Sequence, residues 1–87
     1  MNYLKMEKLI IKSLKVNIPD NAYHILGKEK CGYVLNQDEA LVRENIFQRI
    51  KFAVETLRLD IPKDNDNRFS SQIASVIFQK YIDTEIF

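Results

Sequence analysis

The stretch from residue 37 to residue 59 contains neither glycine nor proline, and its apolar side chains recur with the period of an α-helix. Asn36 precedes the stretch as an N-cap, and Glu39 stands where it completes a variant of the capping box. A helix of this length spans about 34 Å. Its main apolar stripe consists of Val42, Ile46, Ile50, Ala53 and Leu57, with Phe47 and Val54 beside it.

Residues 3–16 predict a first helix with one apolar side and one basic side. The helix should end near Asn17, because Pro19 disfavours helical geometry at Ile18. The apolar stripe consists of Tyr3, Met6, Ile10 and Leu14, widened by Leu4, Leu9 and Ile11. The opposite side carries Lys5, Lys8, Lys12 and Lys15.

A last helix is predicted from about Arg68 to Glu85, after a loop of turn-forming residues over 60–67. Either Asp66 or Asn67 could cap this helix. The face that we expect to be buried contains Phe69, Ile73, Val76, Ile77 and Tyr81, and the opposite face contains Ser71, Gln72, Ser75, Gln79 and Asp83.

Residues 19–35 allow two structures. Pro19 could open a short helix that ends at Gly27, with Asp20 in its first turn and Tyr23, Ile25 and Leu26 on its buried side. In the alternative, residues 23–26 and 33–35 form a hairpin, which would need a helix to cover it. We favour the helix.

Because two glycines and two prolines also argue against a turn-rich β fold, we predict an all-α domain over 1–87. It is a small bundle of three long helices plus a short helix or hairpin at about 19–35.

The residue types that carry chemistry are scarce. One cysteine and one histidine exclude an intramolecular disulfide and a closed zinc site. Cys31 and His24 are the nucleophile–base candidates, but no motif surrounds Cys31. The Asp-rich segment 64–66 lacks the glycine of a calcium loop, because Phe69 stands there, and 27–32 lacks the Gly-Lys-Ser/Thr of a phosphate loop. We therefore expect no enzymatic activity, no cofactor and no metal site.

The four lysines of the first helix are the most specific charged feature. A formal net charge of +1 does not suggest general nucleic-acid binding. One interpretation of the lysine face is contact with an acidic protein patch, phosphate backbone or anionic lipid. The other is the solvated side of an ordinary amphipathic helix. The face carries neither arginine nor aromatic side chains, which weakens a specific nucleic-acid interpretation.

The helix predicted at 37–59 carries a second apolar line made of Leu41, Phe52 and Leu59, which lie within about 20° of one another around the axis. A helix that is apolar on two sides is either central in the fold or also faces a partner. We expect partial burial, with Phe52 in the core and Leu41 or Leu59 at an edge that a partner could reach.

In size and helical pattern the chain is similar, at the level of class only, to small bacterial immunity, antitoxin and phage-encoded inhibitor proteins. Many of those inhibitors are markedly acidic, which this chain is not. The sequence shows no secretory signal, and its apolar run at residues 9–11 is far too short for a membrane span. Together with the single cysteine, this predicts a cytoplasmic protein.

Our first hypothesis is a non-enzymatic helical protein-binding module, a small regulator or inhibitor that occludes a surface of its partner. The expected contacts are Lys5, Lys8, Lys12 and Lys15, then Leu41, Phe52 and Leu59. A homodimer through the apolar line is a further option. The alternative hypothesis is a nucleic-acid-associated regulator that places the same four lysines on phosphates.

Overall fold

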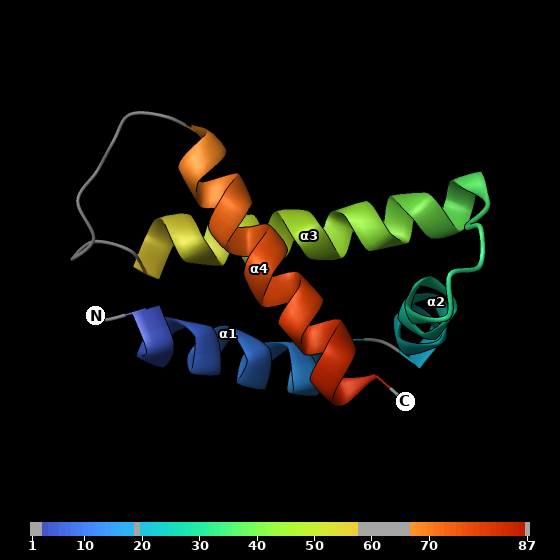
Figure 1. Cartoon of the computed structure of the whole chain (residues 1–87), viewed down its shortest axis with the longest axis horizontal. Coiled ribbons are helices and arrows are strands. Elements are labelled where there is room, and N and C mark those ends of the chain that lie inside the picture. Colours follow the sequence, from blue (N-terminus) through green and yellow to red (C-terminus); the bar gives the residue numbers. More distant parts are fainter. Residues whose placement is uncertain (1–2, 19, 58–66, 87) are drawn as a thin grey trace.

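The computed structural model describes residues 3–18, 20–57 and 67–86, the side chains of 67–69 excepted. Within these ranges the chain forms helices without any strand (Figure 1). The elements are α1 (Tyr3–Asn17), α2 (Asp20–Lys30), α3 (Gln37–Leu57) and α4 (Asn67–Glu85). The predicted all-α bundle is therefore confirmed, with a short helix rather than a hairpin at 19–35.

The helices pack around a central pair made of α3 and α4. Both α1 and α2 contact α3 and α4, whereas α1 and α2 do not contact each other within the described ranges. Figure 1 shows α1 and α3 running in opposite directions along the long axis, with α4 crossing in front of both and α2 at one end. In this arrangement α4 reaches every other helix.

The core lies where α4 crosses its neighbours. Among the described side chains, each of α1, α2 and α3 buries three apolar ones, and α4 with the residue after it buries six. The buried apolar residues are Met6, Ile10 and Leu14 of α1; Ala22, Ile25 and Leu26 of α2; Ile46, Ile50 and Val54 of α3; and Ala74, Ile77, Phe78, Tyr81, Ile82 and Ile86. Burial of apolar surface stabilises a fold by roughly 25 cal/mol per Å². The described side chains of α4 therefore contribute the largest share of the free energy gained by burial.

The end of α2 differs from its prediction. The helix continues through Gly27 to Lys30, and the backbone reverses at Gly32, whose φ is 82°. The Tyr33 amide donates to the Lys28 carbonyl at 3.0 Å, and the Gly32 amide donates to the Glu29 carbonyl at 3.0 Å. These two bonds form a Schellman motif, in which a left-handed residue satisfies the last carbonyls of a helix. Gly32, not Gly27, ends α2.

The predicted capping box at the start of α3 is present. The Glu39 amide donates to Asn36 Oδ1 at 2.9 Å, and the Asn36 amide donates to Glu39 Oε1 at 3.0 Å. Lys28 Nζ of α2 also donates to Glu39 Oε2 at 2.6 Å. That hydrogen bond, followed by the one from the Asn36 backbone, lowers the pKa of Glu39 below its usual value of 4.5.

Side chains of α2 donate to carbonyls at the end of α4 and of the residue after it, which have no partner within the helix. Tyr23 Oη donates to the Glu85 carbonyl at 2.9 Å, and Lys30 Nζ donates to the Ile86 carbonyl at 2.5 Å. Tyr23 is consequently half-exposed rather than buried as predicted. The hydroxyl has to remain at the rim of the core to reach the end of α4.

The buried face of α4 is turned relative to the prediction. Ile77 and Tyr81 are buried and Ile73 is partly buried, as expected, but Val76 is 56% exposed. Phe78 and Ile82 are buried in its place, because three helices pack against one side of α4. The predicted loop over 60–67 lies outside what is described except for Asn67, which is the first residue of α4. The Asp-rich segment 64–66, the cap at Asp66, and the side chains of Asn67 and Phe69 are not described either.

Candidate protein-binding surface on α1 and α4

The predicted lysine face of α1 is exposed along its whole length. Lys5, Lys8, Lys12 and Lys15 are all open to solvent. Lys15 Nζ lies 3.3 Å from Glu85 Oε2 of α4. In the described part of the chain, no carboxylate lies within ion-pair distance of Lys8 or Lys12. These two ammonium groups are therefore available to an incoming anion.

A groove runs beside the lysine face, between α1 and α4, and we call it the α1–α4 groove. Lysines and apolar side chains alternate along it. It is lined by Leu4, Glu7, Lys8, Ile11, Lys12, Lys15, Val16, Lys80, Thr84 and Glu85. Four lysines against two glutamates leave the groove positively charged.

Glu7 is the buried carboxylate of the groove. Lys80 Nζ donates to Glu7 Oε1 at 2.5 Å, across the junction of α4 with α1. Burial, and then the hydrogen bond to Glu7 and its negative charge, raise the pKa of the neighbouring Tyr3 hydroxyl. Because Glu7 is held by these two partners, it offers little negative charge to repel an acidic ligand.

Exposed aliphatic side chains lie among the lysines. Leu4 is 63% exposed and Val16 is 76% exposed, while Ile11 is half-buried against the core. Leu4 and Leu9 were expected to widen the buried stripe of α1, but both are exposed. The core reaches α1 from the side of Met6, Ile10 and Leu14, so residues about 100° away on either flank remain outside it.

The second apolar line, on α3, lies on the outside of the molecule. Phe52 is 71% exposed and Leu41 is 59% exposed, so the expectation that Phe52 belongs to the core is wrong. The other helices pack against the opposite side of α3, where Ile46, Ile50 and Val54 are buried. Leu59 lies outside the described residues. The residues around Phe52 are Gln48, Arg49, Lys51 and Glu55. Because they carry both positive and negative charges, they favour neither an acidic nor a basic partner.

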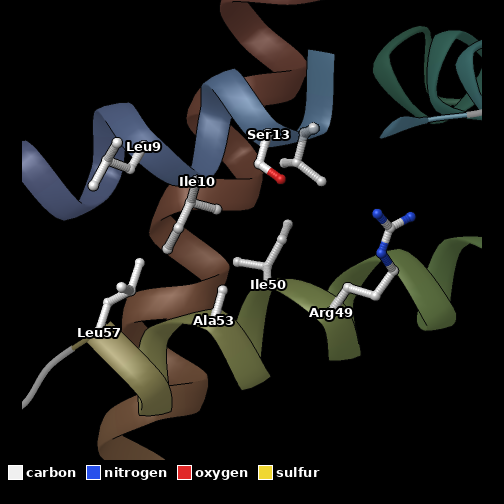
Figure 2. A pocket seen from close by; sticks show the side chains of 8 residues that line it. Leu9, Ile10, Ser13, Arg49, Ile50, Ala53 and Leu57 are labelled. Atoms are coloured by element: carbon white, nitrogen blue, oxygen red, sulfur yellow. The ribbon is translucent and has the colours of Figure 1, made fainter. Parts of the chain in front are cut away.

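A small cleft separates α1 from α3 (Figure 2). Its volume is about 180 Å³, below the roughly 300–1,000 Å³ of typical ligand pockets. Figure 2 shows aliphatic side chains of α1 and α3 lining it from both sides, with Arg49 and Ser13 toward one end. The lining consists of Leu9, Ile10, Ser13, Leu14, Arg49, Ile50, Ala53 and Leu57. Such walls suit further apolar packing, and they bring together no acid–base pair.

The candidate catalytic residues do not meet. His24 and Cys31 are both exposed, on α2 and just after it, and no hydrogen bond joins their side chains. Among the described residues, no group of three His, Cys, Asp or Glu side chains is placed to hold a metal ion. The surface with a distinct chemical character is therefore the lysine face with its groove.

Comparisons with protein-family models, with curated proteins and with solved structures found no match to this chain. Among the described helices, none combines the length with the apolar content that a bilayer span requires. Function therefore has to be argued from the surface itself. Sequence periodicity identified the lysines of α1 in advance. It did not identify Lys80 and Thr84, because their place in the groove depends on how α4 crosses α1.

Proposed function

We propose that this protein is a non-enzymatic binding module that captures an acidic surface of another cytoplasmic protein. Its working surface is the lysine face of α1 together with the α1–α4 groove. The observation that carries the proposal is that Lys8 and Lys12, which no carboxylate of the described residues pairs with, lie beside the exposed Leu4 and Val16. A mixed cationic and apolar surface is complementary to a protein patch with carboxylates and aliphatic groups.

A protein partner explains this surface better than a nucleic acid does. Phosphates would be attracted by the lysines but would gain nothing from Leu4 or Val16. Base stacking and base-edge contacts need aromatic side chains or arginine, and the groove lining contains neither. The aliphatic residues are thus useful only to a partner that has apolar groups of its own.

Occlusion is a mechanism that a chain of this size can perform. A standard interface buries about 800 Å² on each partner. The accessible surface of the chain is 5893 Å², so one face supplies enough area without rearrangement of the core. A rigid helix held over a partner's acidic site would block that site from its substrate or target. The protein would act as a small regulator or inhibitor.

The proposal is tested with two double variants that reverse the same number of positive charges on different helices. Lys8→Glu with Lys12→Glu alters the lysine face, and Arg49→Glu with Lys51→Glu alters α3 by the same amount. Tagged wild type and both double variants are used to capture proteins from the source cell, and the captured protein is purified for calorimetry. We expect the α1 variant to lose at least about tenfold in affinity and the α3 variant to bind like wild type.

Salt dependence provides the second readout. Wild-type affinity for the purified partner should fall as salt rises, because part of the attraction is between exposed charges. Equal loss in both double variants, or no loss in either, would contradict the proposal. Tight, salt-sensitive binding of generic duplex DNA that disappears in the α1 variant would instead favour the nucleic-acid alternative.

A further inference from the structure

The outer flank of α1 carries a helix-packing seam that no described helix covers. Leu4, Lys8, Ile11 and Lys15 follow one another at spacings of four, three and four residues. This alternation places side chains in one line along a helix and is the spacing at which two helices interlock. We call these four residues the outer seam. All four line the α1–α4 groove.

The outer seam repeats the spacing of the seam that α1 already uses toward the core. Tyr3, Glu7, Ile10 and Leu14 also stand four, three and four residues apart, and each is buried or partly buried. The outer seam is the same pattern moved by one residue, or about 100° around the axis. In the outer seam every second position is a lysine, and Leu4 remains 63% exposed.

On α4, the groove-lining residues Lys80 and Thr84 continue a row that begins outside the groove, at Val76. Val76, Lys80 and Thr84 follow one another at intervals of four residues, and Val76 is 56% exposed. A shallow hollow on α4 shares Lys80 and Thr84 with the groove, so the two surfaces are continuous. A helix laid along the groove would touch lysine side chains on both walls and aliphatic side chains on the α1 wall, and it would reach Val76 only where it extended over the hollow on α4.

We propose that the partner inserts an acidic amphipathic helix into the α1–α4 groove, where it packs as a fifth helix of the bundle. This inference rests on the proposed function, since it names the element by which an acidic protein is captured. A lysine in a packing seam needs a carboxylate opposite it, because an unpaired charge is costly once water is excluded. A regularly spaced acidic helix supplies such carboxylates together with the apolar groups between them.

The outer seam sets the pattern of the inserted helix. Lys8 and Lys15 are seven residues apart, as are Leu4 and Ile11. The partner should therefore repeat a carboxylate and an aliphatic residue every seven positions, over about three to four turns. A carboxylate of the partner that faces Lys15 would share this lysine with Glu85, whose Oε2 already lies 3.3 Å from Lys15 Nζ. The carboxylate facing Lys8 is the stronger contact for this reason.

The probe is a fluorescent designed peptide of about 18 residues with leucine and glutamate alternating at seam positions. A scrambled peptide of the same composition, which lacks the repeat, is the first control. A peptide with lysine in place of each glutamate is the second. Fluorescence anisotropy with the full chain measures each affinity. We expect the periodic acidic peptide to bind at least about tenfold tighter than either control.

Matched leucine variants locate the peptide on the protein. Leu4 of the groove and Leu41 of α3 are exposed to nearly the same extent, 63% and 59%. Leu4→Ala should weaken binding of the periodic peptide by about three- to tenfold, whereas Leu41→Ala should leave it unchanged. Lys8→Glu should weaken it further, while the lysine-bearing peptide should gain affinity for that variant.

The failures of the two proposals are distinguishable. If the periodic and scrambled acidic peptides bind equally, or if neither binds, the inserted helix is wrong, while lysine-dependent capture of an acidic protein would still support the proposed function. Tighter binding of phosphatidylserine vesicles or duplex DNA than of the periodic peptide would overturn the inference. Self-association in sedimentation that Leu4→Ala abolishes would assign the groove to a second copy and would overturn it too.

Discussion

Phe52 and Ile50 stand two residues apart on α3, and their side chains lie on opposite sides of the helix. Ile50 is fully buried and Phe52 is 71% exposed. We predict that Phe52→Ala changes the free energy of unfolding by less than about 1 kcal/mol, because an exposed ring leaves no cavity. Ile50→Ala, the matched control, should cost about 2–5 kcal/mol. Urea denaturation of both variants measures the difference, and a comparable loss in both would place Phe52 in the core after all.

Ser70 is a polar residue at a core position of α4. Its side chain is fully buried, and its hydroxyl has no hydrogen-bond partner among the described residues. We predict that Ser70→Ala raises the free energy of unfolding by about 0.5–1 kcal/mol, because it removes an unsatisfied polar group and improves helix propensity. A thermal melt of the two proteins gives the sign. A fall in the midpoint would mean that the hydroxyl has a partner worth more than this cost.

The position of Phe52 shows where prediction from sequence stops at the residue scale. The helical period correctly placed Ile46 and Ile50 on one side of α3 and Leu41 and Phe52 on the other. It could not decide whether the second side is also covered, because that depends on where α1, α2 and α4 pack. The same reason explains Val76, which lies beside the buried face of α4 and is 56% exposed.

At the scale of an element, the two glycines around the end of α2 should respond oppositely to alanine. Gly27 lies inside the helix, and a Cβ there would meet Ile86 at an ordinary 3.9 Å. We predict that Gly27→Ala stabilises the protein by about 0.5–1 kcal/mol. Gly32 has a φ of 82°, so Gly32→Ala should cost about 1–2 kcal/mol. Chemical denaturation of the two variants measures both changes in the free energy of unfolding. Equal changes would contradict the observed end of α2.

The capping box of α3 should make stability depend on pH. The pKa of Glu39 is lowered in the folded protein by its hydrogen bonds from Lys28 and the Asn36 amide. A carboxylate with a lowered folded pKa stabilises the protein above its unfolded pKa, and that contribution is lost as pH falls through the folded value. We predict that wild type is more stable than Glu39→Gln at neutral pH and that the difference shrinks as the pH falls below the usual carboxyl pKa of 4.5. A difference independent of pH would contradict this.

The α2 region was the least predictable element, for a local reason. Gly27 and Gly32 are both acceptable helix ends or turn residues in the sequence. The choice is made by contacts from distant parts of the chain, since Tyr23 and Lys30 bind the end of α4 while Lys28 and Glu29 bind α3. The start of α3, in contrast, uses residues three positions apart, and its capping box could be predicted from the sequence.

For the molecule as a whole, we predict folding that needs neither metal nor disulfide. The chain has one cysteine, and the described core is made almost entirely of apolar side chains. A thermal melt should therefore be the same with and without a chelator or a reductant. A large fall of the midpoint with the chelator would point to a bound ion, and the segment 64–66 would be the place to look for it.

Only the α1 lysines of the candidate site were predictable, since Leu4 was expected to widen the buried stripe and is 63% exposed. A single helix determines which residues share its lysine face, so the period was sufficient there. The other wall of the groove comes from Lys80 and Thr84, more than sixty positions along the chain. Bringing them together requires the crossing of α4 over α1, which no local pattern specifies. The ion pairs of Glu7 with Lys80 and of Lys15 with Glu85 follow from that crossing.

The packing of α4 against all three other helices has a consequence for synthesis on the ribosome. A nascent chain that has emerged only as far as residue 57 has α1 and α2 without contact between them, and it lacks the six buried apolar side chains of α4 and Ile86, against which the other helices pack. Its amphipathic segments should remain exposed to chaperones until α4 leaves the exit tunnel. Folding of this domain is thus expected to require the emergence of α4, which contacts all three other described helices.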